Sequence, residues 1–243
     1  MCHDDDSRPP SPPVVGEVAE QGLLTLTGAD GTTFAAYAAV PSEPNGRNVV
    51  ILPDVRGLHP YYEHLAVRFA EAGFHAVAFD YFGRTQGAAQ RPDGFDWQSE
   101  IGTLTPAGVE SDVAAAAAYL RGRNDGPTFT LGFCFGGSHS WRLSASDLDL
   151  AGVMGFYGRP AMVEDVEASM ATPMLLLVAG ADAATPLEEF EALDARLSTA
   201  GVDHEMHVYA GAPHSFFDRG FAQWRDACAD AWTRMLDFTA AHA

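Results

Sequence analysis

The sequence predicts a single α/β domain in which helices flank a doubly wound, mostly parallel sheet, with an antiparallel hairpin at its N-terminal side. Three observations lead to this fold class. Apolar runs such as Val49–Leu52 and Met174–Ala179 are continuous, which is typical of strands that helices cover on both faces. Segments of helical periodicity separate these runs, so right-handed crossovers between parallel strands are expected. Gly28–Gly31 lies between two strand-like segments and indicates a hairpin.

The predicted elements alternate along the chain. Residues 1–20 are rich in proline and charge and predict a flexible N-terminal tail, and residues 21–243 form the one domain. The strand-like runs are Leu23–Thr27, Thr33–Val40, Asn48–Leu52, His75–Phe79, Thr128–Phe133, Gly152–Tyr157, Met174–Ala179 and His204–Tyr209. Helical patterns lie near Tyr61–Ala72, Val109–Arg121, Phe135–Ser146, Pro186–Ala200 and Phe221–Ala240. The long, glycine-rich connection from Tyr81 to Gly108 is expected to wall a pocket.

Composition excludes several classes of protein. The chain has 243 residues, 47% of them apolar, which suits the core of one domain. A formal net charge of −19 argues against nucleic acids and anionic membranes as partners. No apolar run is long enough to span a bilayer and the first residues do not resemble a secretory signal, so the cytoplasm is the expected location. All 14 basic residues are arginine, which excludes chemistry that needs a lysine, such as Schiff-base formation.

The segment Thr128–Gly137 is the most specific feature of the sequence. A strand-like run meets Gly132-Phe-Cys134-Phe-Gly-Gly, and a helical pattern follows. This is the arrangement of a nucleophile elbow with cysteine in the position of serine. The N-terminus of the following helix would direct the N–H of Phe135 toward an oxyanion and favour a thiolate. The alternative is that Cys134 is a small buried apolar residue.

A nucleophilic thiol needs a base and an acid that orients it, in the chain order nucleophile, acid, histidine. Asp182 ends the second strand-like run after the elbow, and His214 lies in a loop between the last strand and the last helix. Asp80 also ends a strand but precedes the nucleophile, so it is interpreted as structural. The other histidines and the three widely spaced cysteines do not have the spacing of metal ligands, so neither a metal nor a cofactor is expected.

These motifs resemble the dienelactone hydrolase family of the α/β-hydrolase fold. The resemblance runs from about Asn48 to the last helix and rests on the segments 132–137, 179–182 and 211–216. It implies a triad of Cys134, Asp182 and His214. It also implies an oxyanion hole from the backbone N–H groups of Phe135 and Val55, and carboxylate-bearing enol-lactones as the type substrate.

The resemblance extends to the substrate pocket with two departures. Asp54 stands where the family's founding members have a glutamate near the resting thiol, and Arg84 matches the first of two arginines that hold a substrate carboxylate. The position of the second is Asp218, followed by Arg219. An aspartate there would repel an anion unless Arg219 or Arg56 turns inward. Asp54, Arg56, Arg84 and Arg219 are therefore the candidate substrate-binding residues. Asp54 is also expected to hold Cys134 as a neutral thiol.

The sequence thus predicts an enzyme that cleaves a carboxylic ester or lactone through a thioester on a cysteine. Its expected partner is a small-molecule substrate, and it is expected to be a monomer or a small homo-oligomer. The alternative function is a non-catalytic small-molecule receptor or a thiol redox sensor on a hydrolase scaffold. A redox sensor would need a resolving cysteine close to Cys134, which the spacing does not suggest.

Overall fold

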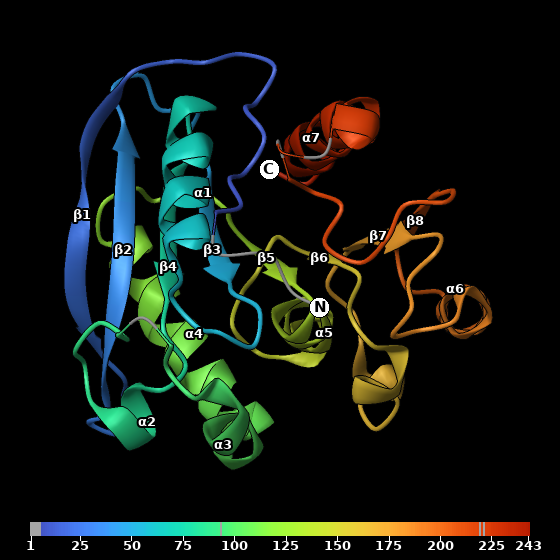
Figure 1. Cartoon of the computed structure of the whole chain (residues 1–243), viewed down its shortest axis with the longest axis horizontal. Coiled ribbons are helices and arrows are strands. Elements are labelled where there is room, and N and C mark those ends of the chain that lie inside the picture. Colours follow the sequence, from blue (N-terminus) through green and yellow to red (C-terminus); the bar gives the residue numbers. More distant parts are fainter. Residues whose placement is uncertain (1–5, 93, 219, 221) are drawn as a thin grey trace.

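Strands that are buried along their whole length form the centre of the fold. The computed structural model describes residues 6–92, 94–218, 220 and 222–243. Its eight strands form one sheet in the order β1-β2-β4-β3-β5-β6-β7-β8 (Figure 1). The first two pairings, β1 with β2 and β2 with β4, are antiparallel, and the others are parallel. The strands are β1 Val18–Thr27, β2 Thr33–Pro41, β3 Asn48–Leu52, β4 His75–Phe79, β5 Thr128–Phe133, β6 Gly152–Phe156, β7 Met174–Ala179 and β8 His204–Tyr209.

Helices cover both faces of the sheet. Successive residues of a strand point to opposite faces, so Val49 and Ile51 of β3 belong to one apolar cluster and Val50 and Leu52 to the other. The first cluster packs against α1 and α7, and the second against α4, α5 and α6. The helices are α1 Pro60–Glu71, α2 Gly83–Gln86, α3 Trp97–Glu100, α4 Pro106–Arg121, α5 Phe135–Arg142, α6 Leu187–Ala200 and α7 Arg225–Ala241. Short 3₁₀ turns are η1 Ile101–Thr103, η2 Leu143–Ala145, η3 Pro160–Met162, η4 Glu167–Ser169 and η5 Ala222–Trp224.

Local sequence signals mark where α1 and α4 begin. Pro60 follows His59, whose Nδ1 accepts a hydrogen bond from the backbone N–H of Tyr61 at 3.3 Å. Pro106 follows Thr105, whose hydroxyl accepts one from the N–H of Gly108 at 3.1 Å. With these caps, α1 starts one residue and α4 three residues earlier than the helical patterns in the sequence predict.

The doubly wound parallel sheet and the N-terminal hairpin agree with the fold class that the sequence predicts. Three details differ. The predicted helix from Phe135 to Ser146 ends as an α-helix at Arg142 and continues as η2. The last helix begins at Arg225, and Phe221 lies outside the described residues. The long connection after β4 contains α2, α3 and η1.

The N-terminal segment is the largest departure from expectation. Residues 1–5 lie outside the described part of the chain. The segment that follows is not a flexible tail but packs on the domain. Ser7 is 5% exposed, and Pro9, Pro10 and Pro12 are buried. The strand β1 already begins at Val18. The physical reason is that proline rings are apolar and can be buried without a donor that needs a partner.

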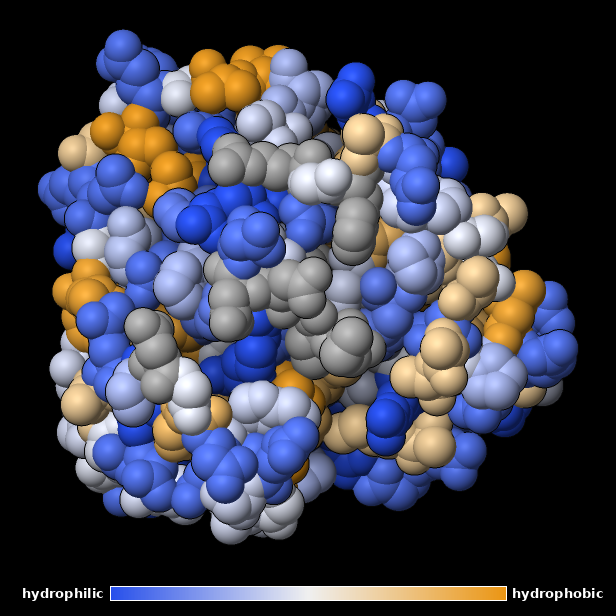
Figure 2. All heavy atoms as spheres, viewed as in Figure 1, coloured by the Kyte–Doolittle hydropathy of each residue, from blue (hydrophilic) through white to orange (hydrophobic). Residues whose placement is uncertain are grey.

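The surface is strongly polar, in keeping with the net charge. Figure 2 shows one face of the molecule as mostly hydrophilic, with separate apolar patches. None of the helices in the described part of the chain combines the length and the apolar character that crossing a bilayer requires.

Candidate active site

Cys134 lies in a strained turn between β5 and α5. Its backbone has φ 54° and ψ −113°, a conformation that few residues other than glycine adopt. Its N–H donates to the carbonyl of Phe156 at 3.0 Å, which ties the turn to the neighbouring strand β6. The flanking glycines are required by space, because a Cβ at Gly132 would overlap the carbonyl of Gly136 and one at Gly136 would overlap that of Leu52. The elbow predicted from the sequence is therefore present.

His214 connects Asp182 to Cys134. Its Nδ1 lies 2.6 Å from Oδ2 of Asp182, and its side chain also hydrogen-bonds with that of Cys134. The two loops that carry the acid and the histidine are joined by a hydrogen bond from the N–H of Ala181 to the carbonyl of Ala212, at 2.9 Å. The ring of Tyr157, directly after β6, packs against the imidazole with ring centroids 4.6 Å apart. The structure thus brings the three predicted residues together.

The electrostatics of this arrangement favour a protonated imidazole. Burial lowers the pKa of His214, but hydrogen bonds to Asp182 and Cys134 outweigh this effect and raise the pKa to about 9. Burial raises the pKa of the Asp182 carboxyl, yet hydrogen bonds from His214 and from the N–H of Ala184 hold it below its usual value. An ionised Asp182 beside a protonated His214 can stabilise a thiolate at Cys134.

The predicted oxyanion hole lies between two parallel strands. The register pairs Leu52 of β3 with Gly132 of β5, so the loop that carries Val55 runs beside the elbow. Phe135 is the first residue of α5, and an N–H in the first turn of a helix has no acceptor within the helix. Phe135 and the Val55 loop therefore lie at the ends of two neighbouring strands, and their role as an oxyanion hole stays a prediction.

Three of the candidate substrate-binding residues, Asp54, Arg56 and Arg84, take part in ion pairs within the protein. Both oxygens of Asp54 are bound by the guanidinium of Arg56, at 3.1 and 2.9 Å, and the carboxylate is 1% exposed. The guanidinium of Arg84 binds Asp112 on α4 and Asp30 in the β1–β2 turn. Arg56 and Arg84 therefore serve internal ion pairs.

The remaining candidate, Arg219, lies outside the described residues. Its neighbour Asp218 is 5% exposed, and its Oδ1 accepts hydrogen bonds from the N–H of Gly220 at 2.8 Å and of Arg8 at 3.4 Å. In the part of the chain that is described, no three histidine, cysteine or carboxylate side chains are grouped as metal ligands would be.

Asp80 has the structural role that the sequence suggests. Its buried carboxylate accepts hydrogen bonds from the N–H groups of Leu58 and Phe82, at 3.3 and 3.1 Å, and forms an ion pair with Arg91. Because Leu58 lies three residues beyond Val55, this carboxylate holds one side of the loop that carries Val55. The pKa of Asp80 is raised by burial, an effect that Arg91 opposes.

Arg159 is a residue that the sequence analysis missed. It follows Tyr157 by two positions, and its N–H donates to the hydroxyl of Ser138 at 2.7 Å, which in turn donates to the carbonyl of Cys134. The side chain is exposed, and no hydrogen bond or ion pair joins its guanidinium to any described residue. The signal in the sequence was the position of this arginine just after β6, the strand between β5, which leads to Cys134, and β7, which leads to Asp182.

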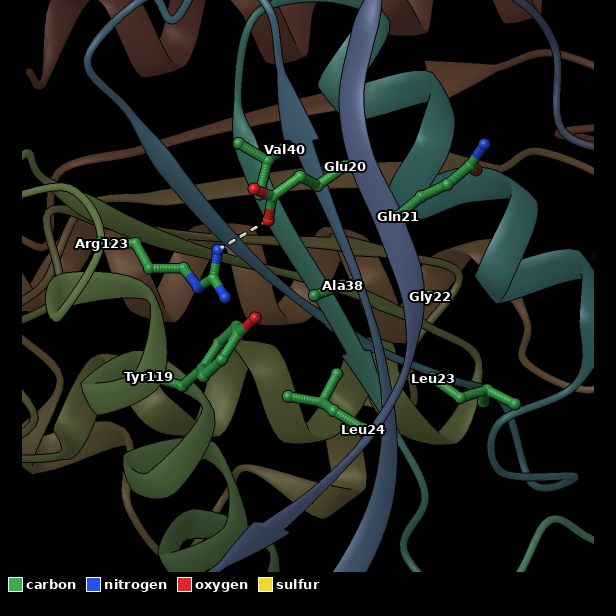
Figure 3. Close-up of a pocket in the computed structure, with 9 residues that line it drawn as sticks. All are labelled: Glu20, Gln21, Gly22, Leu23, Leu24, Ala38, Val40, Tyr119 and Arg123. Carbon is green, nitrogen blue, oxygen red and sulfur yellow. Dashed lines mark hydrogen bonds and ion pairs between the residues drawn. The ribbon is translucent and has the colours of Figure 1, made fainter.

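Two hollows of the surface lie away from these residues. One of about 210 Å³ is lined by β1, β2 and the end of α4, where Arg123 pairs with Glu20 (Figure 3). Another of about 500 Å³ follows α4 beside Thr27 and Ala29. Neither hollow contains a residue of the predicted triad.

Comparison with known proteins assigns the family. The family model "Dienelactone hydrolase family" matches residues 34–243. A Yersinia pestis relative is 28% identical over 236 residues, covering 90% of this chain and 87% of that protein. A carboxymethylenebutenolidase of Rhodococcus opacus is 27% identical over 253 residues, covering 98% of this chain and 96% of that protein.

Solved structures agree on the fold. A dienelactone hydrolase-like promiscuous phosphotriesterase from metagenomic libraries superposes with a TM-score of 0.75 at 23% identity, covering 91% of this chain and 98% of that one. The Pyrococcus furiosus esterase Pf2001 does so with a TM-score of 0.67 at 15% identity, covering 97% and 99%. The chain therefore belongs to the dienelactone hydrolase family and is a lactone or ester hydrolase of the α/β-hydrolase fold.

Proposed function

We propose that this enzyme hydrolyses a carboxylic ester or lactone through a thioester on Cys134. The observation that carries the proposal is the hydrogen-bonded chain from Asp182 through His214 to the thiol at the elbow. A protonated histidine held by a carboxylate is the partner that a nucleophilic thiolate requires.

The reaction has two halves. The Cys134 sulfur attacks the carbonyl carbon, and the N–H groups of Phe135 and Val55 stabilise the oxyanion that forms. The carbon–oxygen bond of the ester then breaks, and His214 gives its proton to the leaving oxygen. In the second half neutral His214 takes a proton from water, the hydroxide attacks the thioester, and the sulfur leaves as the thiolate. Asp182 orients the imidazole throughout.

The substrate class follows from the leaving group. A thiolate is expelled from a tetrahedral intermediate more readily than an alkoxide or an amide nitrogen. The intermediate therefore goes forward most easily when the substrate has a stabilised leaving oxygen, as in an enol-lactone or an aryl ester. The name of the Rhodococcus opacus relative is consistent with this class, and we propose enol-lactones and activated esters as substrates.

The test is a panel of aryl esters and enol-lactones assayed with wild type, Cys134→Ala and Cys228→Ser. Removing the nucleophile should lower kcat/KM by about four orders of magnitude, whereas Cys228→Ser should change it little. Rapid quench and intact-protein mass spectrometry should find the acyl group on wild type and not on Cys134→Ala. Substantial turnover by Cys134→Ala would refute the thioester mechanism.

A further inference from the structure

A proline-rich segment at the N-terminus lies against the loop that carries His214. We name residues 7–12, Ser-Arg-Pro-Pro-Ser-Pro, the N-terminal strap. Figure 1 shows this dark blue segment leaving β1, crossing over α1 and descending between α1 and α7 toward the middle of the molecule. The next residues of the same segment face water: Val14 is 74% exposed and Val15 58%. The buried part is thus confined to the strap.

Two contacts anchor the strap. The indole Nε1 of Trp232, a fully buried residue of α7, donates to the carbonyl of Pro10 at 3.2 Å. The N–H of Arg8 donates to Oδ1 of Asp218 at 3.4 Å. An extended proline-rich chain has free carbonyls and a small conformational entropy to lose, so one buried indole donor can hold it.

Both residues that bind the strap, Trp232 and Asp218, contact or belong to the loop that carries His214. The ring of Trp232 packs against that of Phe217, with centroids 6.0 Å apart, and Asp218 is the next residue. Phe217 and Asp218 are three and four positions beyond His214 in the chain.

The His214 loop depends on such side-chain contacts because it has little regular structure. Ser215 has a positive φ of 62°, and the carbonyls of Phe216 and Phe217 accept hydrogen bonds from the side chains of Cys228 and Tyr61. Without the strap, Asp218 would lose one of its donors and Trp232 would be exposed to water beside Phe217.

We infer that the N-terminal strap is a positioning element for catalysis. Arg8 and Pro10 hold Asp218 and Trp232, and through them the loop that keeps His214 between Asp182 and Cys134. Neither strap residue touches the reacting atoms. The inference rests on the proposed function, since it assigns the strap to the base of that reaction. A base displaced by a fraction of an ångström loses much of its effect. A loosened loop should therefore lower kcat while leaving KM, and so the binding of substrate, nearly unchanged.

The test uses the full chain. Replacing Pro9, Pro10 and Pro12 by glycine frees the strap, and replacing the exposed Pro13, Val14 and Val15 by glycine is the matched control. The strap variant should lower kcat by about tenfold with KM changed less than threefold. The acid limb of its pH–kcat/KM profile should also shift, because His214 moves relative to Asp182. The control should retain wild-type values.

A second variant tests the anchor and guards against misfolding. Trp232→Phe keeps the aromatic ring and removes the N–H donor to Pro10, so it should lower kcat in the same direction. Combined with the strap variant, Trp232→Phe should lower kcat no further, because both changes remove the same contact. Additive losses, or wild-type kcat in a folded strap variant, would overturn the inference. If wild type itself shows no hydrolysis that depends on Cys134, the proposed function fails instead.

Discussion

The loops at the carboxyl edge of the sheet fall into two groups that use their charges differently. After β3 and β4, the carboxylates and arginines bind each other: Asp54 with Arg56, and Asp80 with Arg91. After β6, β7 and β8, the polar groups instead converge on the thiol, and Arg159 remains uncommitted among the described residues. The first group stabilises the loop conformations, and the second contains the residues that we propose perform the chemistry. Charge alone does not distinguish the two groups, because each contains paired carboxylates. The difference lies in the partner, which is an arginine in the first group and the histidine beside the thiol in the second.

The sharpest test of this comparison replaces one strand-end aspartate from each group. Asp182→Asn should lower kcat by about 10³–10⁴-fold, because the amide no longer orients and stabilises the imidazolium, with little change in stability. Asp80→Asn should lower the free energy of unfolding by about 3 kcal/mol, because it leaves Arg91 without its partner in a buried site. Its kcat should fall by about tenfold at most. Steady-state kinetics and urea unfolding measure both effects, and a reversed pattern would contradict the division.

A second prediction concerns the pH dependence of stability. The pKa of His214 rises from its ordinary value of 6.5 to about 9 on folding. The folded state therefore binds this proton more tightly, so the stabilisation is complete below pH 6.5 and is lost as the pH rises toward 9. We expect wild type to lose about 3 kcal/mol more than His214→Gln between pH 6 and 9.5. Urea unfolding at the two pH values measures the difference. Equal losses of unfolding free energy in both proteins would show that folding does not raise the pKa of His214.

A third prediction separates Arg84 from Arg159 as candidates for anion recognition. Arg159→Ala should lower by about tenfold the preference for a carboxylate-bearing aryl ester over its methyl ester, because no described residue pairs with its guanidinium. Arg84→Ala should leave that preference as it is and should destabilise the fold by about 2 kcal/mol, since Asp112 loses its partner. The ratio of kcat/KM values for the two esters is the measurement. The distant Arg123→Ala, which removes the same charge (Figure 3), is the control.

The smallest expected effect concerns the pair of Asp54 and Arg56. Asp54→Asn should speed iodoacetamide labelling of Cys134 by about threefold, since removal of the anion favours the thiolate. Arg56→Gln should slow it by a similar factor, because the carboxylate then acts without its counter-charge. Labelling rates across pH, with Cys2 and Cys228 replaced by serine, measure both. Shifts of the same sign in the two variants would mean that the pair does not act on the thiol electrostatically.

Much of the candidate site could be predicted because its signals are local. The glycines around Cys134 are required by the close approach of backbone at the elbow, so the spacing itself indicates the turn. Asp182 and His214 each follow a strand, and parallel strands end at the same edge of a sheet. Family resemblance added Val55, which no local pattern in the sequence would have indicated.

Tertiary structure alone decided which charges are available. Arg84 and Arg56 match or neighbour family positions, yet their roles depend on Asp112, Asp30 and Asp54, which only the fold brings within reach. Likewise, composition predicts a tail at the N-terminus, because proline and charge offer little to bury in an isolated segment. The strap is buried all the same, because α7 presents the indole of Trp232 where Pro10 passes. Sequence by itself determined the order of the elements and the presence of a cysteine at the elbow, since both depend on spacing along the chain. The partners of each charge and the course of the strap depend on contacts between distant segments, and only folding creates those.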